Sequence, residues 1–191
     1  VAKNKNCHIH IKIDTGMSRI GFQVNEDTAN TILEISKLPN IIIEGIFTHF
    51  ANADESDKTP TYAQIERYQT MLDMLSERNV HIPIKHCSNS AGIVDLPEAN
   101  MNMVRAGIIL YGLWPSDDVN KTNMDLRPVM SLKSHISYLK TLEAGRKISY
   151  GGTYVTTGET RVATVPVGYA DGYRRSLSGK FYVLIRGQRA P

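Results

Sequence analysis

The sequence has few cysteines and no long apolar run. Cys7 and Cys87 are the two cysteines among its 191 residues, so one disulfide bond is the most that could form and a fold held by several disulfides is excluded. Such sparse cysteine usage favours a reducing compartment, and we expect a cytoplasmic protein. The longest apolar candidate, 41–50, contains Glu44 and is shorter than the roughly 18 to 20 residues that cross a bilayer. We therefore expect no membrane partner.

The chain also lacks an excess of charge of one sign. Its 22 Lys and Arg residues and 19 Asp and Glu residues leave a formal net charge of +3, with no run of five like charges, so nucleic acid is not an expected partner. Because 41% of the residues are hydrophobic and 21% are charged, the composition is that of a soluble globular protein. The sequence opens on Val1 and stops at Pro191 directly after a strand-like run, and we expect it to be a section of a longer protein.

Apolar periodicity predicts strands that alternate with helices over the first 110 residues. Apolar and polar residues alternate over 7–14, which is the period of a strand. Helices are expected after a cap at Asn25 and from Thr59 onward, with a short helical turn over 90–96. Further strands are expected over 41–50, 80–87 and 101–110. Four strands joined through helical segments favour parallel pairing by right-handed crossovers. The fold class is therefore α/β, and we expect the second half of a (β/α)8 TIM-type barrel.

The pattern changes after Trp114. Residues 115–128 are polar and have little periodicity, which indicates a boundary, and we expect two domains, 1–120 and 121–191. Beyond the boundary, glycines separate β-leaning runs at 131–139, 160–167 and 181–185. This part is expected to be the start of an all-β domain.

In a parallel barrel the active site lies at the carboxyl ends of the strands, so the residues that follow each expected strand are candidates. Ser90 offers a hydroxyl and an amide at the start of the short helix, and Gly107 leaves room for a ligand beside the backbone. Barrels commonly bind phosphate on the loops after their last strands, which makes this pair a candidate phosphate site. In the alternative interpretation, Ser90 is only a helix cap and Gly107 only a packing glycine.

Three basic or imidazole side chains share the first expected strand face: His8, His10 and Lys12. Two imidazoles could begin a metal site, but no third ligand lies at a suggestive spacing, so we expect them to fill the barrel interior and expect no metal. An inward-facing Lys12 needs an anionic partner or a changed chemical state. His49, at a strand end, is either a general base or an orienting hydrogen-bond donor.

Two turns in the second half of the chain carry tyrosines. Tyr150 precedes Gly151 and Gly152, and Tyr169 opens a turn that ends in Arg174 and Arg175. Either turn is ordinary turn chemistry or a pocket wall. To act as a base near neutrality, a tyrosine needs a pKa well below its free value of about 10.

Taken together, the motifs resemble bacterial alanine racemases, the pyridoxal-phosphate enzymes of fold type III, over essentially the whole chain. They stand in the family's order at 12–21 (KIDTGMSRIG), 48–55 (THFANADE), 87–91 (CSNSA), 103–112 (MVRAGIILYG), 149–154 (SYGGTY), 167–173 (VGYADGY) and 187–191 (GQRAP). The family's fold is an eight-stranded barrel followed by a β domain. The resemblance implies that the expected strands are the last four of that barrel.

The resemblance implies pyridoxal 5'-phosphate as the cofactor. Ser90, Gly107 and Ile108 would hold its phosphate. Arg105 would face its pyridine nitrogen, and His49 would hydrogen-bond toward Arg105.

The resemblance also implies a homodimer whose active site is shared between subunits, with a small amino acid as substrate. Tyr150 would be the catalytic tyrosine, which reaches into the site of the partner. Arg19 would contact the phenolic oxygen of the cofactor and the substrate carboxylate, and Lys12, often carbamylated in this family, would position Arg19. The substrate entrance would be lined by Tyr169, with Asp54 and Arg175 further out.

The implied reaction interconverts L-alanine and D-alanine with one base on each face of the cofactor, and it supplies D-alanine for peptidoglycan. The lysine that forms the Schiff base belongs to a motif of the family's first barrel strand, which this sequence does not contain. Rival functions are a broad-specificity or serine racemase of the same fold, a fold-type III decarboxylase, and a barrel-only pyridoxal-phosphate-binding protein without catalysis. The decarboxylases carry a Cys-Glu-Ser-Gly-Asp motif that is absent here. The barrel-only protein has no β domain, so Tyr150 argues against it.

Overall fold

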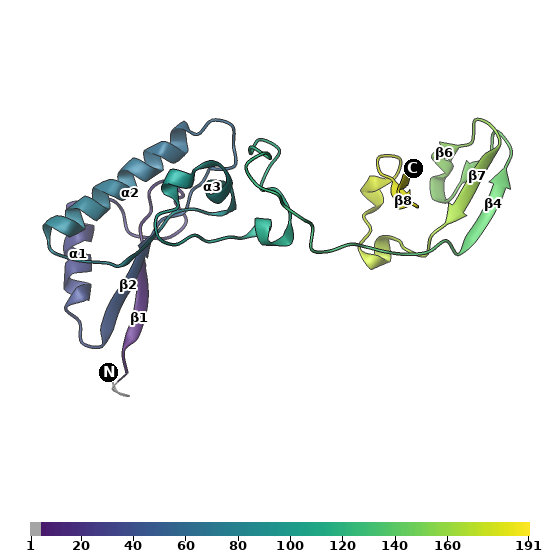
Figure 1. Ribbon diagram of the computed structural model, residues 1–191. Coiled ribbons are helices and arrows are strands. Elements are labelled where there is room, and N and C mark those ends of the chain that lie inside the picture. Colours follow the sequence, from purple (N-terminus) through teal and green to yellow (C-terminus); the bar gives the residue numbers. More distant parts are fainter. Residues whose placement is uncertain (1–4) are drawn as a thin grey trace. The chain divides into compact units, whose positions relative to one another are not determined.

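Three parallel strands form the sheet of the first unit, in the order β1-β2-β3 (Figure 1). The computed structural model describes residues 5–191, and the chain divides after Met130 into two units. The first unit alternates strands and helices: β1 (Cys7–Lys12), α1 (Glu26–Ser36), β2 (Ile41–Phe47), α2 (Thr59–Glu77), β3 (Ile84–His86) and α3 (Ser90–Asp95). This is the α/β pattern that the sequence predicts. Because the three strands form an open sheet, their place in the second half of a barrel stays a prediction.

Both long helices begin where the sequence predicts. The Asn25 side chain caps α1 by accepting a hydrogen bond from the Thr28 amide at 2.8 Å. Pro60 lies in the first turn of α2, where its missing N–H leaves no helical bond unmade. Further along α2, the fully buried Tyr68 donates its hydroxyl to the Ile46 carbonyl at 2.7 Å. That bond ties α2 to β2.

The core lies between the sheet and the two long helices. Ile11, Ile13 and Ile46 come from the strands and their ends, and they are buried with side chains of α1 and α2. The helical members of this core are Ala29, Ile32, Tyr68, Met71 and Leu75. The alternate residues of β1, which include His10 and Lys12, are therefore left for the other face of the sheet.

The strand predicted over 101–110 is wrong. Within the described chain these residues form no strand, and a short 3-10 helix covers Ile108–Tyr111 instead. One backbone hydrogen bond, from the Arg105 amide to the Ser88 carbonyl at 3.0 Å, links the segment to the end of β3. Gly107 then leaves the extended region, with φ −119° and ψ −107°. The apolar residues favour a strand locally, but strand formation needs a continuing ladder of pairs.

The strand predicted over 80–87 is shorter than expected. It begins at Ile84, directly after Pro83, which has no N–H to contribute to a sheet. β1 and β2 likewise end at Lys12 and Phe47. The residues predicted to extend them instead form the loops at the carboxyl edge of the sheet.

A β-bulge in β2 changes which side chains face the interior. Ile9 pairs with Ile43 and His10 pairs with Gly45, so Glu44 is the extra residue on β2. Ile43 and Ile46 can therefore both pack on the core although they are three residues apart. Glu44 is turned toward the same face as His10.

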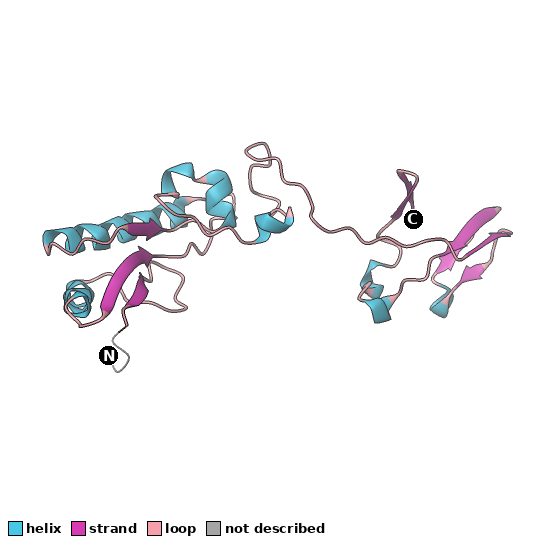
Figure 2. Cartoon of the chain, turned by 60° about the horizontal axis from the view of Figure 1, so that its bottom comes forward, coloured by secondary structure: helices cyan, strands magenta, loops and turns pink. Residues whose placement is uncertain are grey.

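The second unit consists of short antiparallel pairs and single helical turns (Figure 2). β4 (Tyr138–Leu142) pairs with β7 (Thr160–Thr164), β5 (Lys147–Ile148) with β6 (Tyr154–Val155), and β8 (Val183–Ile185) with β9 (Gln188–Ala190). The 3-10 turns cover Tyr150–Gly152, Tyr169–Asp171 and Arg175–Leu177. The strands at 160–164 and 183–185 lie within the second and third β-leaning runs, whereas the strand at 138–142 overlaps only the end of the first run, 131–139.

The polar stretch 115–128 packs on the first unit. Val119 is buried at 3% exposure, the Asn120 amide donates to the Asp95 carboxylate at 3.1 Å, and Asn123 Nδ2 donates to the Val94 carbonyl at 3.0 Å. The boundary expected at residue 120 thus falls inside a segment that contacts α3. The contacts divide the chain at Met130 instead.

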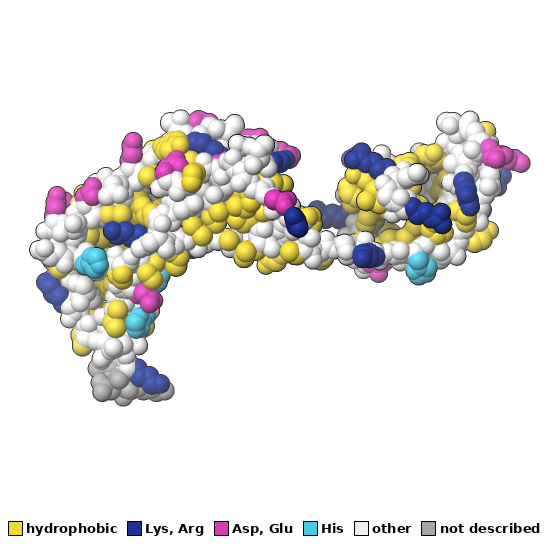
Figure 3. Space-filling model, in the orientation of Figure 1, with side chains coloured by type: hydrophobic (Ala, Val, Ile, Leu, Met, Phe, Trp, Pro, Cys, Tyr) yellow, Lys and Arg dark blue, Asp and Glu magenta, His cyan; other side chains and the backbone are white. Residues whose placement is uncertain are grey.

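Apolar side chains are exposed on the first unit. Ile20, Leu110 and Tyr111 have exposed fractions of 63%, 65% and 63%, and hydrophobic side chains gather along the lower edge of this unit in Figure 3. Exposed apolar surface is typical of protein contact sites. Among the helices of residues 5–191, none has the length and apolar character that a membrane crossing requires.

Candidate active site

Arg105 occupies the place where the carboxyl ends of β2 and β3 meet. Its Nη2 donates to the Thr48 carbonyl at 2.7 Å, to the Cys87 carbonyl at 3.1 Å and to His49 Nδ1 at 3.1 Å. Its Nη1 donates to His86 Nδ1 at 2.7 Å and to the His86 carbonyl at 3.3 Å. A planar guanidinium with five such bonds has little freedom to turn. The first unit therefore holds a fixed positive charge at this edge.

Phe47 lies beside that charge. The Arg105 guanidinium carbon is 5.1 Å from the centroid of its ring, and Lys12 Nζ is 5.8 Å from the same centroid. The His86 imidazole is stacked on Phe47 with a centroid distance of 4.9 Å and an interplanar angle of 5°. Because an aromatic face attracts cations, Phe47 connects Arg105 and Lys12 into one electropositive group.

Burial and the charge of Arg105 lower the pKa values of the two imidazoles, His86 and His49. Burial, with Arg105 and His10 nearby, lowers the pKa of His86 to about 4. Burial and the Arg105 charge lower the pKa of His49 as well. Both rings are therefore neutral near pH 7, and each accepts a hydrogen bond from Arg105 through Nδ1.

We expect the free energy of unfolding to fall as the pH is lowered from about 6.5 to about 4. An unfolded His86 has a pKa near 6.5, whereas the folded value is about 4, so in this window the unfolded chain takes up a proton that the folded chain does not. The loss is about 3 kcal/mol at most, by linkage. Urea unfolding of the full-length protein and of a His86→Asn variant across this pH range measures it. An equal pH dependence in both proteins would contradict the expectation.

Ser90 contacts the backbone of Gly107, which lies two residues after Arg105 and is followed by Ile108. Ser90 Oγ accepts a hydrogen bond from the Gly107 amide at 2.9 Å. Asn89, not Ser90, caps α3, because its side chain accepts from the Gly92 amide at 3.1 Å. The Ser90 hydroxyl is thus free of a capping role. A Cβ on Gly107 would stand 3.3 Å from Ser90 Oγ, so a glycine keeps the space beside this hydroxyl open.

Lys12 is the last residue of β1, and Asp14 and Arg19 belong to the loop that follows it. The Asp14 carboxylate accepts from the amides of Ser18 at 2.9 Å and Gly16 at 3.1 Å, and these bonds lower the pKa of Asp14. Lys12 Nζ donates to the Ile13 carbonyl at 2.7 Å. Burial, opposed by Asp14 and aided by Arg105 and Arg19, lowers the pKa of Lys12. The Arg19 side chain is exposed.

The other candidates lie apart from this group in the chain. Asp54 is half-buried in the first unit, and its carbonyl accepts a hydrogen bond from Ser116 Oγ. In the second unit Tyr150 is 84% exposed and Tyr169 is 70% exposed, and Arg175 is also exposed. Tyr150 stands between Ser149 and Gly151, whose φ angles of 59° and 78° are both left-handed. This turn projects the phenol away from its own unit.

Sequence reasoning missed His86, Phe47 and Glu44. His86 could have been found, because it is the last residue of β3 and so lies at a strand end like the other candidates. The contacts of Phe47 with Arg105 and Lys12 could be recognised only in the structure. The position of Glu44 opposite His10 depends on the β-bulge, and no local sequence signal indicates a bulge there.

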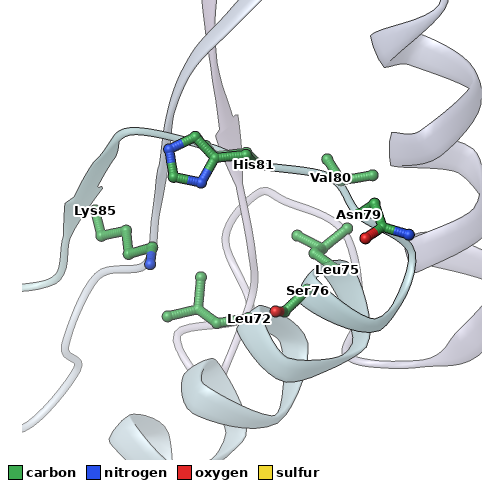
Figure 4. Close-up of a pocket in the computed structure, with 8 residues that line it drawn as sticks. Leu72, Leu75, Ser76, Asn79, Val80, His81 and Lys85 are labelled. Carbon is green, nitrogen blue, oxygen red and sulfur yellow. The ribbon is translucent and has the colours of Figure 1, made fainter.

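A separate cavity lies at the opposite end of β3 (Figure 4). It measures about 280 Å³ and is formed by the last turns of α2 and the segment that enters β3. Its lining residues are Leu72, Leu75, Ser76, Asn79, Val80, His81, Ile82 and Lys85. None of them belongs to the Arg105 group.

Two family models match the chain: the N-terminal domain of alanine racemase over residues 1–115 and the C-terminal domain of alanine racemase over residues 129–191. The curated alanine racemase of Clostridium tetani is 50% identical over 192 residues, which cover 100% of this chain and 50% of that protein. A solved alanine racemase from Clostridium difficile 630 has 53% identity and a TM-score of 0.85, over 98% of this chain and 49% of that one. A structure of alanine racemase from the same organism in complex with cycloserine has 49% identity and a TM-score of 0.82, over 98% and 48% of the two chains. The chain therefore spans about half the length of the relatives that it matches.

Proposed function

The chain belongs to the alanine racemase family, and from that premise we propose that the full-length protein is a pyridoxal 5'-phosphate-dependent racemase that interconverts L-alanine and D-alanine. The setting of Arg105 carries the proposal, because five hydrogen bonds fix its guanidinium at the ends of β2 and β3. The Ser90–Gly107 pair begins two residues further along the chain. Most pyridoxal-phosphate enzymes place a carboxylate opposite the pyridine nitrogen and keep that nitrogen protonated. Arg105 has only donors, so it would leave the nitrogen unprotonated.

The donors of Ser90, Gly107 and Ile108 fit the phosphate of this cofactor. Ser90 would supply a hydroxyl and Ile108 an amide, and the missing Cβ of Gly107 leaves room next to Ser90 Oγ. The Gly107 amide, which donates to Ser90 Oγ in this structure, would donate to the phosphate instead. When bound, the cofactor would withdraw electrons from the Cα–H bond of the amino acid. His49 would keep Arg105 oriented through the 3.1 Å contact between His49 Nδ1 and Arg105 Nη2.

Proton transfer would need one base on each side of the substrate Cα. We assign one side to Tyr150 of the partner subunit in a homodimer, and the other to a lysine outside this chain. Tyr150 is exposed on a turn that its own unit does not cover, as a residue supplied to a neighbour must be.

The remaining candidates would bind and admit the substrate. Arg19 would hold the substrate carboxylate. Lys12, whose pKa is lowered by burial, would react as a neutral amine with carbon dioxide to give a carbamate and a proton, and that anion would position Arg19. The entrance would be formed by Tyr169, Asp54 and Arg175.

We further propose that the first unit supplies the second half of the barrel and the second unit the first part of a β domain. The protein would act in the cytoplasm and provide D-alanine for peptidoglycan. A serine or broad-specificity racemase of the same fold would use the same group of residues.

The experiment is a chiral assay of the full-length protein with pyridoxal 5'-phosphate, offered L-alanine and L-serine separately. We expect D-alanine to form faster than D-serine. Faster conversion of serine would assign the protein to the rival racemase. Cofactor binding without formation of either D-amino acid would overturn the proposal in favour of a binding protein.

A further inference from the structure

The bulge in β2 places Glu44 on the face of the sheet that carries His10, opposite the core and the two long helices. It is the residue skipped between the Ile9–Ile43 and His10–Gly45 pairs, and a bulge re-aims the side chain that it carries. Glu44 Oε2 lies 3.6 Å from His10 Nε2, and Glu44 Oε1 lies 3.5 Å from His8 Nδ1. A carboxylate inside an otherwise apolar strand therefore faces imidazoles on β1.

Hydrogen bonds connect His10 through His86 to Arg105. His10 Nδ1 is 2.8 Å from His86 Nε2, and His86 Nδ1 is 2.7 Å from Arg105 Nη1. Four side chains from β1, β2, β3 and the segment after α3 thus form one chain of contacts. It begins at Glu44 and ends at the guanidinium of the proposed active site.

The donor and acceptor in each of these hydrogen bonds follow from the chemistry of Arg105. A guanidinium can only donate, so His86 Nδ1 must accept and the His86 proton must be on Nε2. His86 Nε2–H then donates to His10 Nδ1, which leaves the His10 proton on Nε2. That proton is on the nitrogen that lies 3.6 Å from the Glu44 carboxylate, an ion-pair contact longer than a hydrogen bond. The two hydrogen bonds are therefore consistent with each other and with a negative charge at the Glu44 end.

We propose that Glu44 and His10 are positioning residues for Arg105: the negative charge of Glu44 stabilises the neutral Nε2–H tautomers that the Arg105 guanidinium requires, and so helps to keep His86 Nδ1 as its acceptor. The inference rests on the proposed function, in which Arg105 faces the cofactor. Two observations support it further, and each is independent of the distances.

The first is the absence of a direct counter-ion. Among residues 5–191, no carboxylate oxygen lies within ion-pairing distance of Arg105, and burial lowers the pKa of its guanidinium. A desolvated cation needs compensation. Polarised hydrogen bonds through His86 and His10 are the route by which Glu44 supplies it.

The second is the residue opposite His10. A Cβ on Gly45 would stand 2.4 Å from His10 ring atoms, so only a glycine lets the imidazole occupy this place. The charged or titratable groups that face His10 are Glu44 on β2 and His86 on β3, while His8 and Lys12 adjoin them on β1.

The first test is the tautomeric state of the histidines in the full-length protein, measured without substrate by nitrogen NMR on histidine-labelled samples near pH 7. We expect the Nε2–H tautomer at both His10 and His86, assigned by His10→Asn and His86→Asn variants. An Nδ1–H tautomer or an imidazolium at either position would overturn the proposal. This measurement requires no turnover, so it tests the hydrogen-bond directions even if the protein fails to racemise alanine. Because Arg105 alone predicts the same tautomers, the Glu44 variants below decide what Glu44 contributes.

The second test compares Glu44→Ala, Glu44→Gln and the exposed surface variant Glu34→Ala. Glu44→Ala should mix the tautomers of His10 and lower kcat by on the order of tenfold, as loss of an outer hydrogen-bond partner does elsewhere, with KM for alanine unchanged. The Gln amide oxygen can still accept from His10, so Glu44→Gln should keep the tautomers and recover most of kcat. Glu34→Ala should match the wild type. Wild-type kcat and tautomers in Glu44→Ala would contradict a positioning role.

Discussion

Replacing Tyr150 by Phe in the full-length protein is expected to lower racemisation by about 10²- to 10⁴-fold, which is the usual loss when a positioned acid or base is removed. The two enantiomers have equal free energies, so the equilibrium constant is one. The loss in kcat/KM must therefore be the same for L-alanine and for D-alanine. The exposed phenol makes no contact that folding requires, because its side chain is 84% exposed in its own unit. Cofactor binding and the free energy of unfolding should therefore be unchanged.

The matched control is Tyr138→Phe, which removes a hydroxyl from an exposed side chain of β4 in the same unit and should leave the rate unaltered.

To test the action of Tyr150 across a dimer, Tyr150→Phe subunits are mixed with subunits that lack the Schiff-base lysine. Random pairing makes half of the dimers hybrid, each with one complete site, so activity should return toward roughly a quarter of wild type. Confirmed exchange without recovery would contradict a Tyr150 supplied by the partner.

Replacing Arg105 by Leu is expected to remove activity and to destabilise the first unit by about 1–3 kcal/mol for each buried acceptor that is left unpaired. The change leaves the carbonyls of Thr48 and Cys87 and the acceptor nitrogens of His49 and His86 without the donor that now satisfies them. Each buried acceptor that loses its partner carries a desolvation cost. Arg105→Lys keeps the charge but cannot span the same acceptors, so it should recover only part of the stability.

Urea unfolding measures this effect, with Arg127→Leu as the control. Arg127 pairs with Asp125 on the surface, where its side chain is 86% exposed, and an exposed ion pair contributes about 0–1 kcal/mol. The midpoint should fall clearly for Arg105→Leu and hardly for Arg127→Leu. Equal midpoints would show that the bonds of Arg105 do not support the fold.

Local signals predicted the helices well and the strand ends less well. Asn25 and Pro60 mark helix starts through their own backbone chemistry, so both were readable without tertiary information. The segment over 101–110 has the composition of a strand, yet it lacks a continuing ladder, and pairing partners are not encoded locally. For the same reason the bulge at Glu44, and with it the contact to His10, could not be predicted.

The candidate site was predicted more completely by resemblance than by residue physics. Periodicity alone pointed to strand ends and suggested Ser90 and Gly107 for a phosphate, but it did not single out Arg105. The motif around Arg105 did so, and the structure shows why that residue type is needed there: only a planar group with several donors can bridge the ends of β2 and β3. His86 went unnoticed because its importance comes entirely from its contact with Arg105.

Exchange of the alanine Cα proton in deuterated water tests the proposed function most directly. The full-length protein with pyridoxal 5'-phosphate is given L-alanine in D2O, and the Cα–H signal of each enantiomer is followed by proton NMR after chiral separation. Removal of the proton on one face and return on the other predicts D-alanine that carries deuterium at Cα, with deuterium also entering the L-alanine pool at equilibrium. If the cofactor binds but the Cα proton is fully retained and no D-alanine forms, the proposed racemase function is contradicted.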